Sequence, residues 1–233
     1  MNNLFNSLWP APMAKVSGPV PSRYFGVWAR TRLTTPELND NSTFVRWMQL
    51  SVWHADLRVP VSESQSCQGF SGLTRVSERH DGEVCTWHRL VDYQAPRDTV
   101  DEGYMVFETP ERVIETGIHG VYHEVWERLS GSEGQRLALA EPLKANGSGR
   151  TRLFVSGEYV MRVRPCTPLG PAFEITFGRW SGQSWHIEQS TIKQLVNQVL
   201  PLHITRSSID TAVVQHHHED ASEWGILEWA TPT

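Results

Sequence analysis

Three segments of the chain carry charged and aromatic side chains at alternating positions, namely WHADLR (53–58), TWHRLVDYQ (86–94) and VYHEVWERL (121–129). All three are rich in strand-forming residues, and alternate side chains of a strand face opposite sides. Trp87 and Arg89 therefore share one face of their strand, and Tyr122, Glu124 and Trp126 share one face of theirs. Each of these faces combines large rings with charged groups that could orient a ligand or transfer protons.

A strand face that mixes rings with charges is typical of a ligand cavity. Large aromatic side chains are uncommon on a solvent face, and an unpaired charge is costly in a dry core. In a cavity wall the rings supply contact area, and a few paired charges orient the ligand. The alternative is that the charged groups lie on the outside, with their stems packed over tryptophan rings.

We expect several strands to line one cavity, with Trp53 and Leu57 on the opposite side of their strand from Asp56 and Arg58. The residues expected to face this cavity together are Arg58, Trp87, Arg89, Tyr122, Glu124 and Trp126. The candidate ligand-binding residues are Trp47, Trp87, Trp126, Tyr93, Glu115, Arg179 and Trp180. If the cavity is catalytic, the candidate catalytic residues are Arg89, Glu124, Tyr122 and Arg58.

Such a cavity is compatible with two functions. The first is a carrier or binding protein for a small hydrophobic or aromatic molecule. The second is a cofactor-free lyase, isomerase or cyclase, in which a carboxylate or histidine acts as general acid or base and an arginine polarises a carbonyl. The alternative to catalysis is that Asp56 with Arg58, and Asp92 with Arg89, form ion pairs that fix the register of the strands.

The remaining motifs indicate neither a metal site nor a cofactor. In VQHHHED (214–220), His216 and His218 would share a strand face and could bind Zn²⁺ or Cu²⁺ with a third ligand. An exposed polar turn is the commoner meaning of such a run, so we predict no metal site there. The sequence contains no HExxH, GxSxG, GxGxxG or GxxxxGK[ST] motif. It therefore lacks the motifs typical of zinc proteases, serine hydrolases and nucleotide-binding proteins.

Short runs of β-branched and aromatic residues alternate with turn clusters such as NDNS, ERHDGE and KANGSGR. This pattern predicts an all-β, antiparallel meander or barrel, with one long strand from Phe44 to Leu57 among its elements. The segment STIKQLVNQVLP (190–201) has apolar residues at helical spacing and ends at Pro201, which predicts one short amphipathic helix. Residues 1–22 contain four prolines and predict an extended arm. Residues 23–233 then form the barrel unit, as one barrel or as two lobes with a boundary near 130–150.

Several blocks resemble a known family. VIETGIHGVYHEVWERL (113–129) and FEITFGRWSGQ (173–183) resemble segments of the fungal Hri family, whose members consist of two lipocalin-like barrels. RWMQLSVWHADLRVP (46–60), GFSG (69–72) and TWHRLVDYQAP (86–96) also resemble blocks of uncharacterised bacterial proteins. The resemblance implies a calycin-type, lipocalin-like barrel fold but no particular reaction or ligand. Because the fungal member is known as a kinase-interacting protein, it also implies a third possibility, a protein-interaction module.

Composition narrows the class of partner. The chain has 233 residues, 39% of them hydrophobic, which is enough to bury a substantial core. Its net charge of −5 comes from interleaved acidic and basic residues, which argues against nucleic acid binding. Three cysteines at irregular spacing suggest reduced thiols, as in a cytoplasmic protein. With no run of eighteen apolar residues and no basic, apolar leader, we expect no membrane association.

Overall fold

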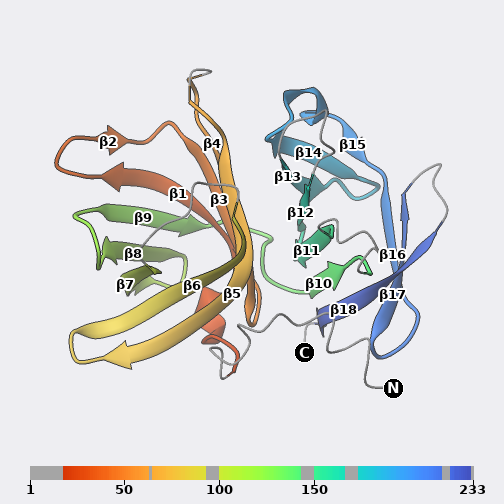
Figure 1. Cartoon of the computed structure of the whole chain (residues 1–233), viewed down its shortest axis with the longest axis horizontal. Helices are drawn as coiled ribbons and strands as arrows, with labels where there is room; N and C mark the ends of the chain where they lie inside the picture. Colours follow the sequence, from red (N-terminus) through yellow and green to blue (C-terminus); the bar gives the residue numbers. More distant parts are fainter. Residues whose placement is uncertain are drawn as a thin grey trace. The chain divides into compact units, whose positions relative to one another are not determined.

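The computed structural model of the protein describes residues 18–62, 65–92, 100–142, 150–165, 173–216 and 221–231. Nearly all of its regular structure is antiparallel β-sheet, which confirms the predicted fold class. The chain divides into two compact units, Pro12–Ser132 and Glu133–Thr233, which we call the N-terminal and C-terminal units (Figure 1). Among the helices of the described residues, none is both long enough and apolar enough to cross a membrane.

The N-terminal unit is a closed barrel. Its elements are the 3-10 turn η2 (Ser22–Tyr24) and the strands β1 (Gly26–Thr34), β2 (Asn39–Asp40), β3 (Phe44–Gln49), β4 (Trp53–Val59), β5 (Gln68–Arg79), β6 (Gly82–Asp92), β7 (Asp101–Thr109), β8 (Arg112–Gly117) and β9 (His123–Arg128). Strands β1 and β3 to β9 pair in chain order, and the pairing of β9 with β1 closes the ring. The result is a closed eight-stranded antiparallel barrel, and the short β2 pairs with the end of β1.

The single strand expected from Phe44 to Leu57 is instead the hairpin of β3 and β4. The side-chain amide of Gln49 donates hydrogen bonds to the carbonyl oxygens of Leu50 at 2.9 Å and Trp53 at 3.3 Å, and the N–H of Leu50 donates to the Trp53 carbonyl at 2.8 Å. These bonds stabilise a tight turn that strand propensity alone does not reveal.

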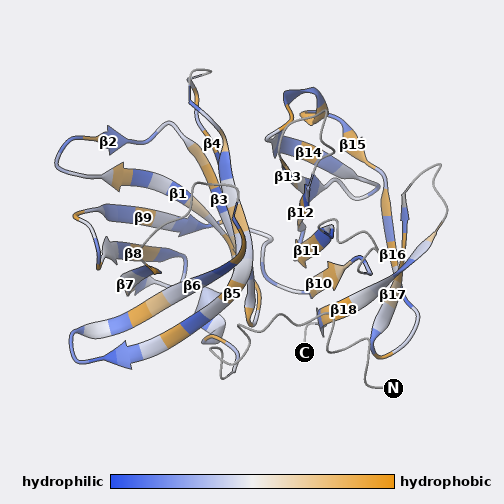
Figure 2. Ribbon diagram, in the orientation of Figure 1, coloured by the Kyte–Doolittle hydropathy of each residue, from blue (hydrophilic) through white to orange (hydrophobic). Residues whose placement is uncertain are grey.

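Aromatic rings fill much of the barrel interior. Trp47 packs against Trp28, Trp87 and Trp126 with ring centroids 6.2, 5.5 and 5.7 Å away. The buried cluster around them consists of Val20, Tyr24, Trp28, Val45, Trp47, Phe70, Cys85, Trp87, Met105, Val113 and Trp126. Figure 2 shows bands of hydrophobic and hydrophilic residues along β5 and β6. Side chains from one face of every strand therefore meet at the barrel axis, as expected for about eight strands.

One bulge brings two strands unusually close. The register of β5 against β6 shifts between Ser71 and Gly72, and a Cβ on Gly72 would lie 1.9 Å from the carbonyl oxygen of His88. Only glycine allows this approach, which bends the sheet toward closure.

The C-terminal unit is a half-barrel. Its elements are β10 (Arg136–Ala140), β11 (Arg152–Ser156), β12 (Tyr159–Pro165), β13 (Phe173–Trp180), β14 (Trp185–Ser190), the 3-10 turn η3 (Lys193–Leu195), β15 (Val199–Leu200), β16 (Leu202–Arg206), β17 (Thr211–His216) and β18 (Ser222–Ala230). They form one sheet in the order β15-β14-β13-β12-β11-β10-β18-β17-β16. The two edge strands, β15 and β16, are separated only by Pro201, so the sheet curls and its edges approach each other at this residue, although no ladder pairs β15 with β16 in the described part of the chain. Proline lacks the N–H that a ladder needs, which suits the point where the chain changes partner from β14 to β17.

The helix expected over 190–201 is reduced to the three residues of η3. Asn197 adopts a positive φ of 66°, and its N–H donates to the Ile187 carbonyl at 2.9 Å. The N–H of Ile187 in turn donates to Gln198 at 2.9 Å. Backbone pairing with β14 thus outweighs the helical spacing of the apolar residues, and Leu195 packs on the half-barrel core from a turn.

Candidate ligand-binding sites

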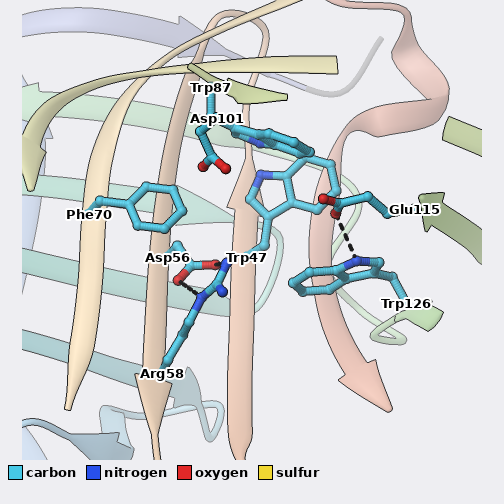
Figure 3. Close-up of a pocket in the computed structure, with 8 residues that line it drawn as sticks. All are labelled: Trp47, Asp56, Arg58, Phe70, Trp87, Asp101, Glu115 and Trp126. Carbon is cyan, nitrogen blue, oxygen red and sulfur yellow. Dashed lines mark hydrogen bonds and ion pairs between the residues drawn. The ribbon is translucent and has the colours of Figure 1, made fainter. Parts of the chain in front are cut away.

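A small cavity lies inside the N-terminal barrel. The strands β3 to β9 all contribute to its lining. The lining consists of Trp47, Asp56, Arg58, Phe70, Trp87, Asp101, Glu115 and Trp126 (Figure 3). Its volume is about 20 Å³, the space that roughly one water molecule needs. We call it the inner cavity. It is too small to hold an aromatic molecule while these side chains keep their positions.

An ion pair between Arg58 and Asp56 forms one wall of the inner cavity. The Nε and Nη2 atoms of Arg58 donate to the two carboxylate oxygens of Asp56 at 2.8 and 3.4 Å, and the Asp56 side chain is 2% exposed. Burial would lower the pKa of the Arg58 guanidinium, but the attraction of Asp56 and Glu124 outweighs it and raises the pKa. Arg58 is therefore a permanent cation among aromatic rings.

Glu115 lies across the cavity in a different environment. It accepts hydrogen bonds from the Tyr122 hydroxyl at 2.7 Å and from Trp126 Nε1 at 3.1 Å. Burial, and after it the charge of Glu124, raises the pKa of Glu115 well above its usual value, although the Tyr122 hydrogen bond opposes the shift. These effects favour the neutral acid.

Two further charged groups near the cavity, Arg89 and Glu124, are also paired. Arg89 donates to Asp101 at 2.6 Å and to Asp92 at 3.0 Å, and its guanidinium lies 3.6 Å from the Phe70 ring centroid. Glu124 accepts a hydrogen bond from Arg30 at 2.7 Å. Both ion pairs proposed from the sequence are therefore present, Asp56 with Arg58 beside the cavity and Arg89 with an exposed Asp92.

Most of the expected cavity residues come together in the N-terminal barrel. Arg58, Trp87 and Trp126 line the inner cavity together with Trp47 and Glu115. Tyr122 and Arg89 contact the cavity residues Glu115 and Asp101, whereas Glu124 bonds to Arg30, which lines a different pocket. Trp53 and Leu57 are fully buried but do not line the cavity. Tyr93 lies outside the described residues.

Sequence reasoning missed Phe70 and Asp101 as lining residues. Phe70 is paired with Asp56 in the β4–β5 ladder, and Asp101 is paired with Trp87 in the β6–β7 ladder. Strand alternation applied to GFSG could have suggested Phe70, but Asp101 gave no signal, because it begins its strand with no repeating pattern before it.

A larger pocket opens where the barrel strands end beyond Arg58. Its volume is about 400 Å³, and its lining consists of Arg30, Leu33, Asp40, Thr43, Arg58, Pro60, Gln65, Ser66 and Gln68. We call it the mouth pocket. Asp40 accepts a hydrogen bond from Arg30 at 3.0 Å. Burial alone would raise the pKa of Asp40, but hydrogen bonds donated by the backbone of Ser42 and Thr43 hold it well below its usual value.

The C-terminal unit contains a pocket of about 370 Å³ lined by Gln135, Leu137, Val155, Gly157, Trp180, Trp185, Leu202, His203, Ile204 and Trp229. We call it the tryptophan pocket. Trp180 and Trp185 pack edge to face with centroids 5.2 Å apart. Trp180, a predicted ligand-binding residue, therefore belongs to a different unit from the inner cavity. Arg179 is outside the lining and instead donates to Glu158 at 2.8 Å on the surface.

Neither metal-site nor disulfide chemistry gains support from the described part of the chain. No group of three potential ligands among His, Cys, Asp and Glu occurs there. Of the histidine run, His217 and His218 lie outside the described residues, and only the backbone of His216 is described. Cys85 is a buried free thiol, and Cys166 lies outside the described residues.

No protein-family model and no curated protein sequence matches the chain. Among solved structures, the chain is similar to the crystal structure of the uncharacterized protein YLR301w from Saccharomyces cerevisiae. The TM-score is 0.63 and the sequence identity 11%, and the match covers 88% of this chain and 99% of that one. At this identity the likeness shows the fold alone, so the resemblance to the Hri family remains a prediction.

Proposed function

We propose that this protein binds a small hydrophobic or aromatic molecule, and that the tryptophan pocket is the binding site. The observation that carries the proposal is the grouping of Trp180, Trp185 and Trp229 around a hollow of about 370 Å³. Pockets that bind small molecules typically have volumes of roughly 300–1,000 Å³ and mainly apolar walls. Leu137, Val155, Leu202 and Ile204 supply the rest of such a wall.

The lining also offers a few polar groups to orient a ligand. Gln135 and His203 lie among the apolar residues. Each tryptophan adds an indole N–H that can donate a hydrogen bond, together with a flat ring face for stacking. These features favour a planar compound with one or two hydrogen-bonding groups.

The catalytic alternative has less support. A catalytic cavity would need Arg58, Arg89, Glu124 or Tyr122 to converge on a substrate with their hydrogen-bonding groups available. Each already has a partner in the barrel, namely Asp56 for Arg58, Asp92 and Asp101 for Arg89, Arg30 for Glu124, and Glu115 for Tyr122. The inner cavity also lacks room for a substrate, which favours binding over turnover.

The test is calorimetric titration of the full-length protein with a panel of aromatic compounds that includes indole, naphthol and flavonoid types. Ile204→Glu places a charge in the wall of the pocket, so it should weaken any binding by at least about tenfold. The matched control is Ile209→Glu, because Ile209 belongs to the same unit but is 77% exposed.

The control should leave binding unchanged. Equal effects of the two substitutions would contradict the tryptophan pocket as the site. If no compound in the panel binds with a Kd below roughly 1 mM, the proposed ligand class is wrong.

A further inference from the structure

The N-terminal barrel brings carboxyl groups and aromatic rings around one small space. Asp56, Asp101 and Glu115 line the inner cavity, and among the described residues Arg58 is the only arginine in that lining. Trp47, Phe70, Trp87 and Trp126 form the rest of the wall. Arg89, which lies outside that lining, pairs with Asp101 and also with Asp92. Even with Glu115 as a neutral acid, the three carboxylates of Asp56, Asp92 and Asp101 therefore contact two guanidiniums, those of Arg58 and Arg89.

Carboxylates also outnumber guanidiniums among the residues between the inner cavity and the mouth pocket. Arg30 and Arg58 contact three carboxylates there, Asp40, Asp56 and Glu124. The side chains of Arg30 and Glu124 are each 6% exposed, so solvent screens their charges weakly. The described residues of this network thus include three carboxylates and two guanidiniums. The excess of negative charge favours the binding of a cation.

The aromatic wall already contacts cations. The guanidinium carbons of Arg58 and Arg89 lie 5.5 and 3.6 Å from the Phe70 ring centroid. Ring faces attract cations, most strongly where water is excluded. The same wall would repel a carboxylate or phosphate ligand, because its ring faces and carboxylates are both negative.

Size then selects the kind of cation. A volume of about 20 Å³ suits a group as large as one water molecule. A primary ammonium group has this size and donates three hydrogen bonds, which the surrounding carboxyl oxygens can accept. A trimethylammonium group is much larger and donates none.

We propose that the N-terminal barrel binds a small primary amine, with the ammonium group in the inner cavity and the rest of the molecule in the mouth pocket. Arg58 lines both spaces, so the two adjoin at its side chain, which a ligand occupying both would contact. The mouth pocket of about 400 Å³ is large enough for the body of such a ligand. Its lining of Thr43, Gln65, Ser66 and Gln68 suits a polar body. This site is independent of the tryptophan pocket.

The first experiment is a titration of the full-length protein at pH 7 with ethanolamine, histamine and 1,4-diaminobutane, followed by intrinsic tryptophan fluorescence and calorimetry. Choline is the matched comparison, because it is the trimethylated form of ethanolamine. At least one primary amine should bind saturably, and choline should bind at least about tenfold more weakly than ethanolamine. The proposal is overturned if none of the three amines binds below about 10 mM, or if choline matches ethanolamine.

The second experiment removes the acceptors. Asp56→Asn and Asp101→Asn should each weaken amine binding by about tenfold or more. Asp101 is 19% exposed, so the second variant keeps the test valid if Asp56→Asn does not fold. The matched control is Glu158→Gln, which also removes a carboxylate paired with an arginine but does so on the surface of the other unit.

The control and the pocket variant Ile204→Glu should both leave amine binding unchanged. This separates the amine site from the proposed aromatic site, because each can fail without the other. Unchanged amine affinity in both asparagine variants would mean that the amine binds elsewhere, and the inner cavity would lose its proposed role.

Discussion

The two units use tryptophan in opposite ways. In the closed N-terminal barrel, Trp28, Trp47, Trp87 and Trp126 belong to one buried cluster and leave an inner cavity of about 20 Å³. In the C-terminal half-barrel, Trp180, Trp185 and Trp229 border a pocket of about 370 Å³. Both units are rich in strands and in large rings. The difference teaches that closure of the sheet, more than aromatic content, decides whether rings pack against one another or remain available to a ligand.

The two units also differ in how far their ion pairs are buried. The N-terminal barrel buries Arg58 with Asp56 beside its cavity, whereas Arg179 and Glu158 of the C-terminal unit pair with side chains about half exposed. A buried pair fixes geometry at a high desolvation cost, and an exposed pair contributes little. Three pairs of substitutions test this comparison.

The largest contrast is expected between Trp47→Ala and Trp180→Ala. Trp47 is 2% exposed and touches three other tryptophans, so its loss should cost about 3–5 kcal/mol of unfolding free energy. Trp180 is 38% exposed, and its loss should cost about 1 kcal/mol or less. Urea denaturation followed by circular dichroism measures both. Similar costs would mean that the N-terminal barrel is not the more tightly packed unit.

The next contrast compares arginines, because Arg58→Met keeps an apolar stem but leaves the buried Asp56 carboxylate without its cation. We expect a loss of about 3 kcal/mol, against about 0–1 kcal/mol for Arg179→Met. Adding Asp56→Asn to Arg58→Met should recover part of the loss, because the unpaired charge is then gone. If the double variant is no more stable than Arg58→Met in thermal denaturation, the loss comes from packing instead.

The smallest contrast concerns two buried glutamates and depends on pH. The pKa of Glu115 is raised in the folded protein, so its contribution to stability is full below the unfolded pKa of about 4.5 and is lost as pH rises. Glu115→Gln should therefore become more stable relative to wild type between pH 5 and 8, by at most about 1.4 kcal/mol per pH unit.

Glu174 of the C-terminal unit provides the comparison for Glu115. It accepts hydrogen bonds from Arg162 at 2.7 Å and Arg164 at 2.6 Å, so Glu174→Gln should be destabilising at neutral pH by about 1–3 kcal/mol. Denaturation midpoints measured across this pH range check both variants. Parallel pH curves for Glu115→Gln and wild type would show that Glu115 is ionised in the folded protein.

Local patterns predicted much of the strand content. Alternation in TWHRLVD and YHEVWER placed Trp87 and Trp126 on the interior side of their strands, and the cavity lining agrees. The same reasoning was wrong where local signals conflict with pairing. The apolar spacing of 190–201 favoured a helix, but hydrogen bonds to Ile187 hold that segment against β14. The segment 44–57 has continuous strand propensity, and only the bonds of Gln49 reveal the turn in it.

The amino-acid sequence by itself determined the β class and which side chains share a strand face, because alternation along a strand is a local property of the backbone. The tertiary structure alone decided which faces meet and how much space remains between them. Arg30 donates a hydrogen bond to Glu124, which lies 94 positions away in the sequence. The ion pair of Arg58 with Asp56 is local, but it lines a cavity only because Trp87 and Glu115 of later strands lie beside it. Closure of the N-terminal barrel and incomplete closure of the other sheet depend on pairings between distant strands. The room left for a ligand is the difference between the volume that such closure encloses and the volume of all the side chains inside, and no single segment contains that quantity.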